Sequence, residues 1–131
     1  INVRLPEGFT IRGSDGVERD QFRSAFWHES PLTYGDLVFQ PDGLPHELQG
    51  WPLSKEEKSL LTHYHAHEKP LFVGHYWRQG EPSLLTPNIA CLDYSAVRAG
   101  LLVAYRMGAE ATLDPAHLVW VKALGEQKKQ K

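Results

Sequence analysis

The sequence predicts an α+β fold, with two or three helices in its N-terminal half and a small antiparallel sheet in its C-terminal half. Two helix-start patterns support the helices, because Thr33 and Ser54 are each followed three residues later by an acidic residue. Short apolar runs separated by turn residues support the sheet. Since the connections are short, we expect a β-meander of three to four strands. The runs are 70–73, 88–94, 101–106 and 117–121.

Two further elements are predicted at the start of the chain. Residues 9–12 alternate apolar and polar side chains and precede turn residues at 13–16, which favours a short strand followed by a turn. The next segment, Val17–Trp27, would place Phe22 and Phe26 on one face of a helix. We therefore expect a strand, a turn and a helix, in that order.

The two capped segments are expected to form helices of different lengths. Thr33 opens a short helix or turn. Residues 40–52 follow it with three prolines and two glycines, so we expect an irregular surface loop there. Ser54 opens a helix that is expected to run to about Ala66, with Leu60 among its inward-facing residues.

Two histidines near the end of that predicted helix, His63 and His67, are four residues apart and would share one helical face. This is metal-ligand spacing on a helix. The carboxylate of the zinc-protease pattern His-Glu-x-x-His is missing between them, and a helix C-terminus favours histidines for its own reasons. We therefore expect adventitious binding of nickel or zinc rather than a native metal site.

The composition is that of a soluble globular domain. The chain has 131 residues, of which 41% are hydrophobic and 23% charged, enough for one core. Its formal charge of −2 gives no general attraction for nucleic acid or an anionic membrane. No apolar stretch approaches the ~20 residues that span a bilayer, and the single cysteine, Cys91, excludes an intramolecular disulfide. We expect a cytoplasmic protein.

The most informative short pattern is the apolar run 70–73 followed by Gly74 and His75. A short, continuous apolar run predicts a strand that is covered on both faces, with His75 just past its C-terminal end. Ligands and metals collect at such strand ends, and a neutral imidazole offers a nitrogen to a metal or a phosphate. The alternative is a hydrogen-bonded histidine with a purely structural role.

Four sequence blocks follow one another in the C-terminal half. They are Phe72–Trp77, Asn88–Ser95, Gly100–Arg106 and Leu118–Val121. In this order and spacing, the chain from about Pro70 to Val121 resembles the C-terminal part of calcineurin-like metallophosphoesterases. The similarity is to the bacterial branch related to serine/threonine protein phosphatases and diadenosine tetraphosphatases. The region before Pro70 resembles the insertion that precedes this part in that branch, through Leu5–Gly8 and Thr33–Leu37.

The resemblance implies part of a four-layer α/β sandwich and a phosphoesterase centre with two divalent ions of manganese, iron, zinc or nickel. In such a centre a bridging hydroxide attacks phosphorus while the two ions hold the phosphate oxygens. The resemblance also implies that His75 is one metal ligand and that Asp93 fixes the tautomer of its ring. For Asp93 the alternative is a turn-initiating residue that binds its own backbone.

The remaining metal-ligand motifs of the family, Asp-x-His, Gly-Asp-x-x-Asp and Gly-Asn-His, do not occur in this sequence. One histidine cannot assemble a two-metal centre, so we expect the C-terminal portion of a longer enzyme, inactive and without tightly held metal on its own. The first residue, Ile1, agrees with that expectation and is also what trimming or a cleaved tag would leave. Trp77 replaces the second histidine of the common Gly-His-x-His motif, and we expect it to be either a core residue or a stacking wall.

Three segments are expected. They are 1–69, a mostly helical cap-like insertion with a short N-terminal strand; 70–124, the β-rich part of the phosphoesterase domain; and 125–131, a disordered tail. The implied partners are the N-terminal remainder of the same protein and a substrate, which is a phosphoprotein or a phosphorylated small molecule such as a dinucleoside polyphosphate. Exposed strand edges would also allow pairing with a second copy. The competing interpretation is a non-catalytic α+β module that binds a partner.

Overall fold

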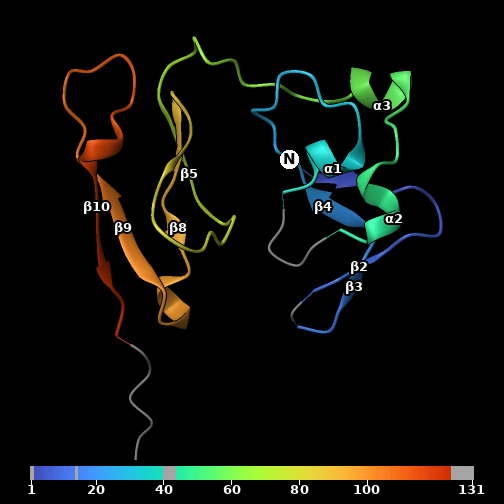
Figure 1. Cartoon of the computed structure of the whole chain (residues 1–131), viewed down its shortest axis with the longest axis horizontal. Helices are drawn as coiled ribbons and strands as arrows, with labels where there is room; N and C mark the ends of the chain where they lie inside the picture. The colour runs from blue at the N-terminus through green and yellow to red at the C-terminus, as the bar shows by residue number, and fades with distance from the viewer. Residues whose placement is uncertain (1, 14, 40–43, 125–131) are drawn as a thin grey trace, which may run out of the picture. The chain divides into compact units, whose positions relative to one another are not determined.

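The computed structural model describes residues 2–13, 15–39 and 44–124, which form three α-helices and several sheets of two or three strands. This confirms the predicted α+β class. The chain divides into unit 1, Ile1–His65, and unit 2, Ala66–Lys131, so the expected boundary at 69/70 lies a few residues later. In Figure 1, unit 1 runs from blue to green and unit 2 from green to red. The tail expected at 125–131 lies outside the described residues.

The residues of unit 1 that the structure describes form two antiparallel strand pairs and three short helices. The strands are β1 (Asn2–Arg4), β2 (Ile11–Arg12), β3 (Glu18–Arg19) and β4 (Gln21–Arg23), and the helices are α1 (Tyr34–Leu37), α2 (His46–Gln49) and α3 (Lys55–Ser59). β1 pairs with β4, and β2 pairs with β3 (Figure 1). The short strand predicted at 9–12 is confirmed by β2. None of the described helices has the length and apolar character needed to cross a bilayer.

The predicted helix at Val17–Trp27 is wrong, because β3 and β4 occupy this segment. The Asp15 carboxylate accepts a hydrogen bond from the Val17 amide at 3.0 Å and pairs with the Arg19 guanidinium at 2.6 Å, which closes a hairpin turn. Phe22 is 1% exposed between two exposed or half-exposed neighbours, the alternation of a strand. The amides of this segment therefore pair with distant strands instead of forming helical hydrogen bonds.

Both predicted helix caps are confirmed. In α1, the Thr33 hydroxyl accepts from the Asp36 amide at 3.3 Å and the Asp36 carboxylate accepts from the Thr33 amide at 3.1 Å. In α3, Ser54 and Glu57 make the same reciprocal pair at 3.1 and 2.7 Å. Such a capping box satisfies amides that have no partner within the helix.

The lengths predicted for the surrounding elements are wrong. α3 ends at Ser59 instead of Ala66, because none of its residues is buried and Leu60 is 81% exposed. Without an apolar face packed on a core, a helix this short is not extended. Within the loop predicted at 40–52, residues 46–49 form α2, which is anchored by the fully buried Leu48. Residues 40–43 lie outside the described part of the chain.

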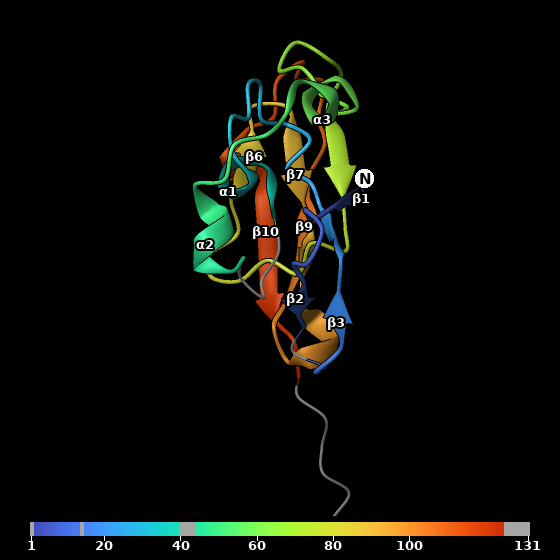
Figure 2. The same cartoon turned by 90° about the vertical axis from the view of Figure 1, so that its right-hand side faces the viewer.

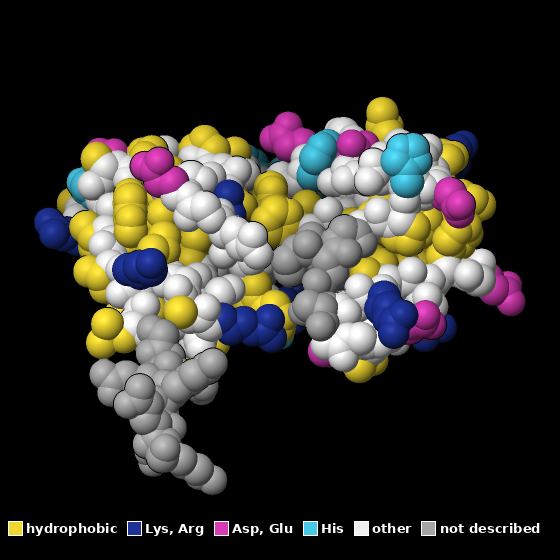
Figure 3. Space-filling view, turned by 60° about the horizontal axis from the view of Figure 1, so that its bottom comes forward, with side chains coloured by type: hydrophobic (Ala, Val, Ile, Leu, Met, Phe, Trp, Pro, Cys, Tyr) yellow, Lys and Arg dark blue, Asp and Glu magenta, His cyan; other side chains and the backbone are white. Residues whose placement is uncertain are grey.

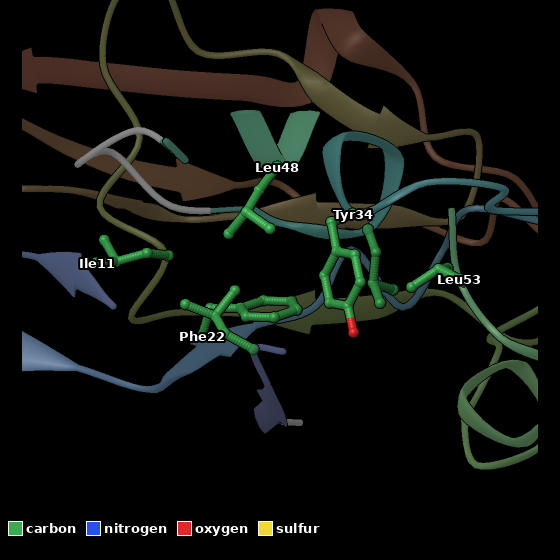
Figure 4. Close-up of a cluster of buried hydrophobic side chains, with 7 residues drawn as sticks. Ile11, Phe22, Tyr34, Leu48 and Leu53 are labelled. Atoms are coloured by element: carbon green, nitrogen blue, oxygen red, sulfur yellow. The ribbon is translucent and has the colours of Figure 1, made fainter. Parts of the chain in front are cut away.

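The core of unit 1 gathers side chains from its strands and helices (Figure 4). It consists of Leu5, Ile11, Phe22, Tyr34, Leu37, Leu48 and Leu53. Tyr34 is fully buried, and its hydroxyl donates a hydrogen bond to the Glu57 carboxylate that caps α3. Burial, and then the bond to Glu57, raise the pKa of Tyr34. α3 is thus attached to the core through one polar contact and not through an apolar face.

The described part of unit 2, residues 66–124, is built from six strands and two 3₁₀ helices. They are β5 (Leu71–Val73), β6 (Leu84–Thr86), β7 (Ile89–Cys91), β8 (Asp93–Tyr94), β9 (Leu101–Tyr105) and β10 (Leu118–Lys122), with η1 (Ala96–Arg98) and η2 (Pro115–His117). β8, β9 and β10 form an antiparallel sheet in the order β10-β9-β8, which confirms the predicted meander; Figure 2 shows β9 and β10 side by side.

Two details of the predicted sheet are wrong. The single strand expected at 88–94 is two strands, because β7 pairs with β5 and β6 whereas β8 pairs with β9. β7 is the buried centre of its sheet, with Ile89, Ala90 and Cys91 all 0% exposed. β5 is parallel to β7 and lies at the edge, and Phe72 is 39% exposed, so β5 is not covered on both faces.

The connection between β9 and β10 is held together by one carboxylate. Glu110 accepts hydrogen bonds from the Tyr105 hydroxyl at 2.7 Å and the Gly108 amide at 2.8 Å, and its Oε1 lies 2.9 Å from Nδ1 of His117. Asp114 lies 3.9 Å from the other ring nitrogen of His117. The hydrogen bond from Tyr105, followed by those from the backbone of Glu110 itself and from His117, lowers the pKa of Glu110 from 4.5 to about 2.

We predict that Glu110 makes unit 2 sensitive to acid. Since the pKa of Glu110 is lower in the folded chain, its charge stabilises the fold above about pH 4.5, and this contribution is lost as the pH falls toward about 2. Urea unfolding of the chain and of Glu110→Gln at several pH values will measure the difference. The gap between the two unfolding free energies should shrink over that pH range. Curves that stay parallel would contradict the prediction.

Candidate functional site

His75 lies where the sequence predicted it, immediately after the C-terminal end of β5, and its side chain is exposed. Its backbone has φ 67°, in the left-handed region. Its amide donates a hydrogen bond to Oδ2 of Asp93 at 2.9 Å. The end of β5 is therefore tied to the start of β8 at the residue that carries the imidazole.

Asp93 joins two loops through its carboxylate. While Oδ2 accepts from the His75 amide, Oδ1 accepts from the Ser95 amide at 3.0 Å. The second contact is the turn in which an aspartate binds the backbone two residues ahead, the alternative expected for Asp93. Both contacts are to main-chain amides, so the role predicted for Asp93 in fixing the imidazole tautomer stays a prediction. In addition, the Asp93 carbonyl accepts from the Arg78 amide at 2.9 Å.

Strained backbone is concentrated in these two loops. Among the described residues, the non-glycine residues with left-handed φ are His75 (67°), Trp77 (45°), Ser95 (59°) and Ala99 (59°). Two follow β5 and two flank η1, between β8 and β9. Each such residue costs on the order of 1–3 kcal/mol and persists only where neighbouring contacts impose it, which happens most often at ligand and catalytic sites.

The turn from β8 to β9 also requires a glycine at position 100. A Cβ there would lie 2.0 Å from the carbonyl oxygen of Tyr94, closer than any atoms can pack. The Gly100 amide donates to the Ser95 carbonyl at 3.0 Å and closes the turn. As a result, η1 projects Val97 and Arg98 outward, and Val97 is 93% exposed.

Trp77 connects His75 to Arg98. The His75 and Trp77 rings lie edge to face, with centroids 5.8 Å apart and an interplanar angle of 90°. The Arg98 guanidinium carbon lies 4.8 Å from the centroid of the Trp77 ring, a cation–π contact. Trp77 is half-buried and is therefore closer to the expected stacking wall than to a core residue.

The loop after Trp77 is fastened to β8 by Arg78. Its guanidinium donates to the carbonyl of Ser83 at 2.9 Å and lies 5.6 Å from the ring centroid of Tyr94. The Tyr94 hydroxyl in turn accepts from the Ser83 amide at 3.0 Å. The Arg78 guanidinium is therefore occupied by Ser83 and Tyr94, and these contacts hold the segment that contains Trp77.

An open apolar groove of about 430 Å³ reaches Gly74 and Asp93. Its walls come from β5, from the end of β8 and from β9, with Phe72, Leu92 and Leu102 among the lining residues. Leu102 is 62% exposed, and hydrophobic side chains also reach the surface elsewhere on the described chain (Figure 3). The groove could take an apolar group next to His75.

The predicted histidine pair is not formed. Because α3 ends at Ser59, His63 and His67 do not share a helical face, and the ring closest to His63 in the described contacts is that of His65, with centroids 4.3 Å apart. Across the residues that the structure describes, no group of three or more His, Cys, Asp or Glu side chains is arranged to hold a metal ion. Cys91 is buried and unpaired.

The sequence did not indicate Arg98 as part of the site. The only local signal was its place before Gly100 in a turn between two strands. Its position on Trp77 depends on the hydrogen bonds of Asp93 and on the tight turn at Gly100, which join segments about twenty residues apart.

No family model, curated protein or solved structure matches this chain. The four-layer sandwich implied by the resemblance therefore stays a prediction. Function is inferred from the residues around His75.

We predict that Asp93→Ala frees both loops. The His75 and Ser95 amides lose their acceptor and become exposed to water, so their hydrogen exchange should accelerate at least tenfold, about 1.4 kcal/mol. Exchange followed by NMR will measure this. Asp114→Ala is the matched control, because Asp114 accepts from the Ala116 amide at 2.9 Å and its loss should affect only η2. Unchanged exchange at His75 would contradict the prediction.

We also predict opposite effects for two alanine-to-glycine changes. Ala99→Gly should stabilise unit 2 by about 0.5–1 kcal/mol, since glycine adopts the left-handed conformation without strain. Ala104→Gly, in the middle of β9, should destabilise it by a similar amount, because glycine loses more entropy in a strand. Urea unfolding will compare the two, and a loss of stability in Ala99→Gly would argue against strain at this turn.

Proposed function

We propose that this chain supplies one metal ligand, His75, to a dimetal phosphoesterase site. The observation that carries the proposal is the combination of an exposed imidazole at a strand end with a backbone locked in the left-handed region by Asp93. The sequence blocks that resemble calcineurin-like metallophosphoesterases support the same role for His75. A phosphorylated small molecule or a phosphoprotein is the proposed substrate, and the cytoplasm the proposed location.

The described residues fit one ligand of such a centre and not the whole centre. Two ions about 4 Å apart need several carboxylates and imidazoles, and no cluster of three ligand-type side chains occurs in the described part of the chain. The proposal therefore requires further ligands from residues beyond those described. When bound, the ions of manganese, iron, zinc or nickel would supply the nucleophile and hold the phosphate.

The chain's own contribution is to aim one side chain. Asp93 fixes the backbone of His75, and the edge-to-face contact with Trp77 limits the orientations of the imidazole. A side chain that is already held in its binding orientation loses less conformational entropy when the metal ion binds. The strain at His75 and Trp77 is consistent with this role, because it orients the ring at a cost in stability.

A non-catalytic binding module is the second candidate. Leu102 and Val121 face each other across β9 and β10 and are 62% and 63% exposed. Together with the apolar groove, they form a surface that a partner could cover. This candidate predicts binding that is independent of metal and of His75.

The proposed function is tested with the full-length product of the gene that encodes this chain. Hydrolysis of p-nitrophenyl phosphate should require added manganese and should fall at least roughly 100-fold in His75→Ala, because a lost ligand removes several kcal/mol of transition-state stabilisation. His67→Ala is the control, since His67 is an exposed histidine of the same unit outside the site. It should leave turnover unchanged.

Two results would overturn the proposal. One is manganese-dependent turnover that survives in His75→Ala. The other is the absence of turnover with any of the four metals while the protein still binds a partner in EDTA, which would favour the binding module.

A further inference from the structure

Arg98 is a preorganised cation that has no carboxylate partner among the residues that the structure describes. Within the part of the chain that the structure describes, no carboxylate or carbonyl accepts a hydrogen bond from its guanidinium, and its recorded side-chain contact is the stack on Trp77. Arg19 and Arg78 differ, because Arg19 pairs with Asp15 at 2.6 Å and Arg78 donates to Ser83 at 2.9 Å. Arg98 is exposed, and its side chain has a fixed neighbour in Trp77, so its five N–H donors remain available to a ligand as far as the described residues are concerned.

The surroundings of Arg98 favour an anion. The carboxylate that joins the loops of Trp77 and Arg98 is that of Asp93, and its two oxygens already accept from the His75 and Ser95 amides. His75 lies against the edge of the same tryptophan and brings an imidazole that can donate a hydrogen bond. The side chains that contact Trp77 are thus a guanidinium and an imidazole, and the carboxylate that joins their two loops already accepts two amides.

We propose that Arg98, stacked on Trp77 beside His75, binds the phosphate group of a phosphate monoester. The planar guanidinium fork matches two phosphate oxygens, and the stack reduces the side-chain entropy lost on binding. The apolar groove that begins at Gly74 and includes Ala96, the first residue of η1, accommodates the rest of the ester. The inference names a substrate class for the proposed function, but this binding needs no metal ion.

The test is a titration of the ¹⁵N-labelled 131-residue chain with phenyl phosphate in EDTA. Saturable chemical-shift changes are expected at the Arg98 Nε–H, the Trp77 indole N–H and the His75 amide. Arg98→Gln should raise the Kd about tenfold, as expected for the loss of a charged hydrogen bond. Phenol, which has the ring without the phosphate, should produce no shift at Arg98.

Arg106→Gln is the matched control, because Arg106 is an exposed arginine just past the far end of β9 and its replacement removes the same charge. It should change the Kd less than about twofold, since an exposed charge at that distance is screened by salt. Equal weakening by the two variants, shifts that avoid the loops around Trp77, or no saturation would overturn the proposal. Spectra of Arg98→Gln that match the unaltered chain outside those loops establish that it folds.

The outcome is independent of the metal proposal. Phenyl phosphate binding that depends on Arg98 would stand even if His75→Ala kept full turnover in the longer protein. Conversely, loss of turnover in His75→Ala would stand if Arg98→Gln bound phenyl phosphate as tightly as the unaltered chain.

Discussion

The carboxylate of Asp93 is the contact on which the candidate site depends. Its two oxygens accept the amides of His75 and Ser95, so one side chain holds both loops at the end of unit 2. The four strained residues lie within these loops. If the carboxylate did not bridge them, the left-handed conformations would relax, and the row formed by His75, Trp77 and Arg98 would have no fixed geometry.

The split of one apolar run into two strands places Asp93 at that point. β7 is the buried centre of one sheet and β8 the edge of another, and the chain passes from one to the other at Leu92. The Leu92 amide still donates to the Val73 carbonyl at 2.9 Å, which keeps β5 aligned up to the residue before Gly74. The buried strand β7 thus leads within two residues to the aspartate that positions the exposed loops, and binding sites are commonly built on loops held by such a scaffold.

In unit 1 the Glu57 carboxylate also joins two parts of the chain, but it contributes to stability and not to the candidate site. One oxygen of Glu57 caps α3 through the Ser54 amide, and the other accepts from the buried hydroxyl of Tyr34. Burial alone would raise the pKa of Glu57, but these hydrogen bonds outweigh it and lower the pKa. A helix without a buried face thereby stays attached to a core formed by distant residues.

The sequence by itself determined those features that depend on residues close together in the chain. The caps at Thr33 and Ser54, the meander from β8 to β10 and the place of His75 after a strand depend on residue types only a few positions apart, and all are present. Tertiary structure decided the rest. Val17–Trp27 forms strands because its amides find partners on β1 and β2, and α3 stops at Ser59 because none of its residues is buried and Leu60 is exposed. Arg98 contacts Trp77 only because the Asp93 carboxylate joins their two loops. The spacing of Arg98 and Trp77 along the chain therefore does not predict their contact.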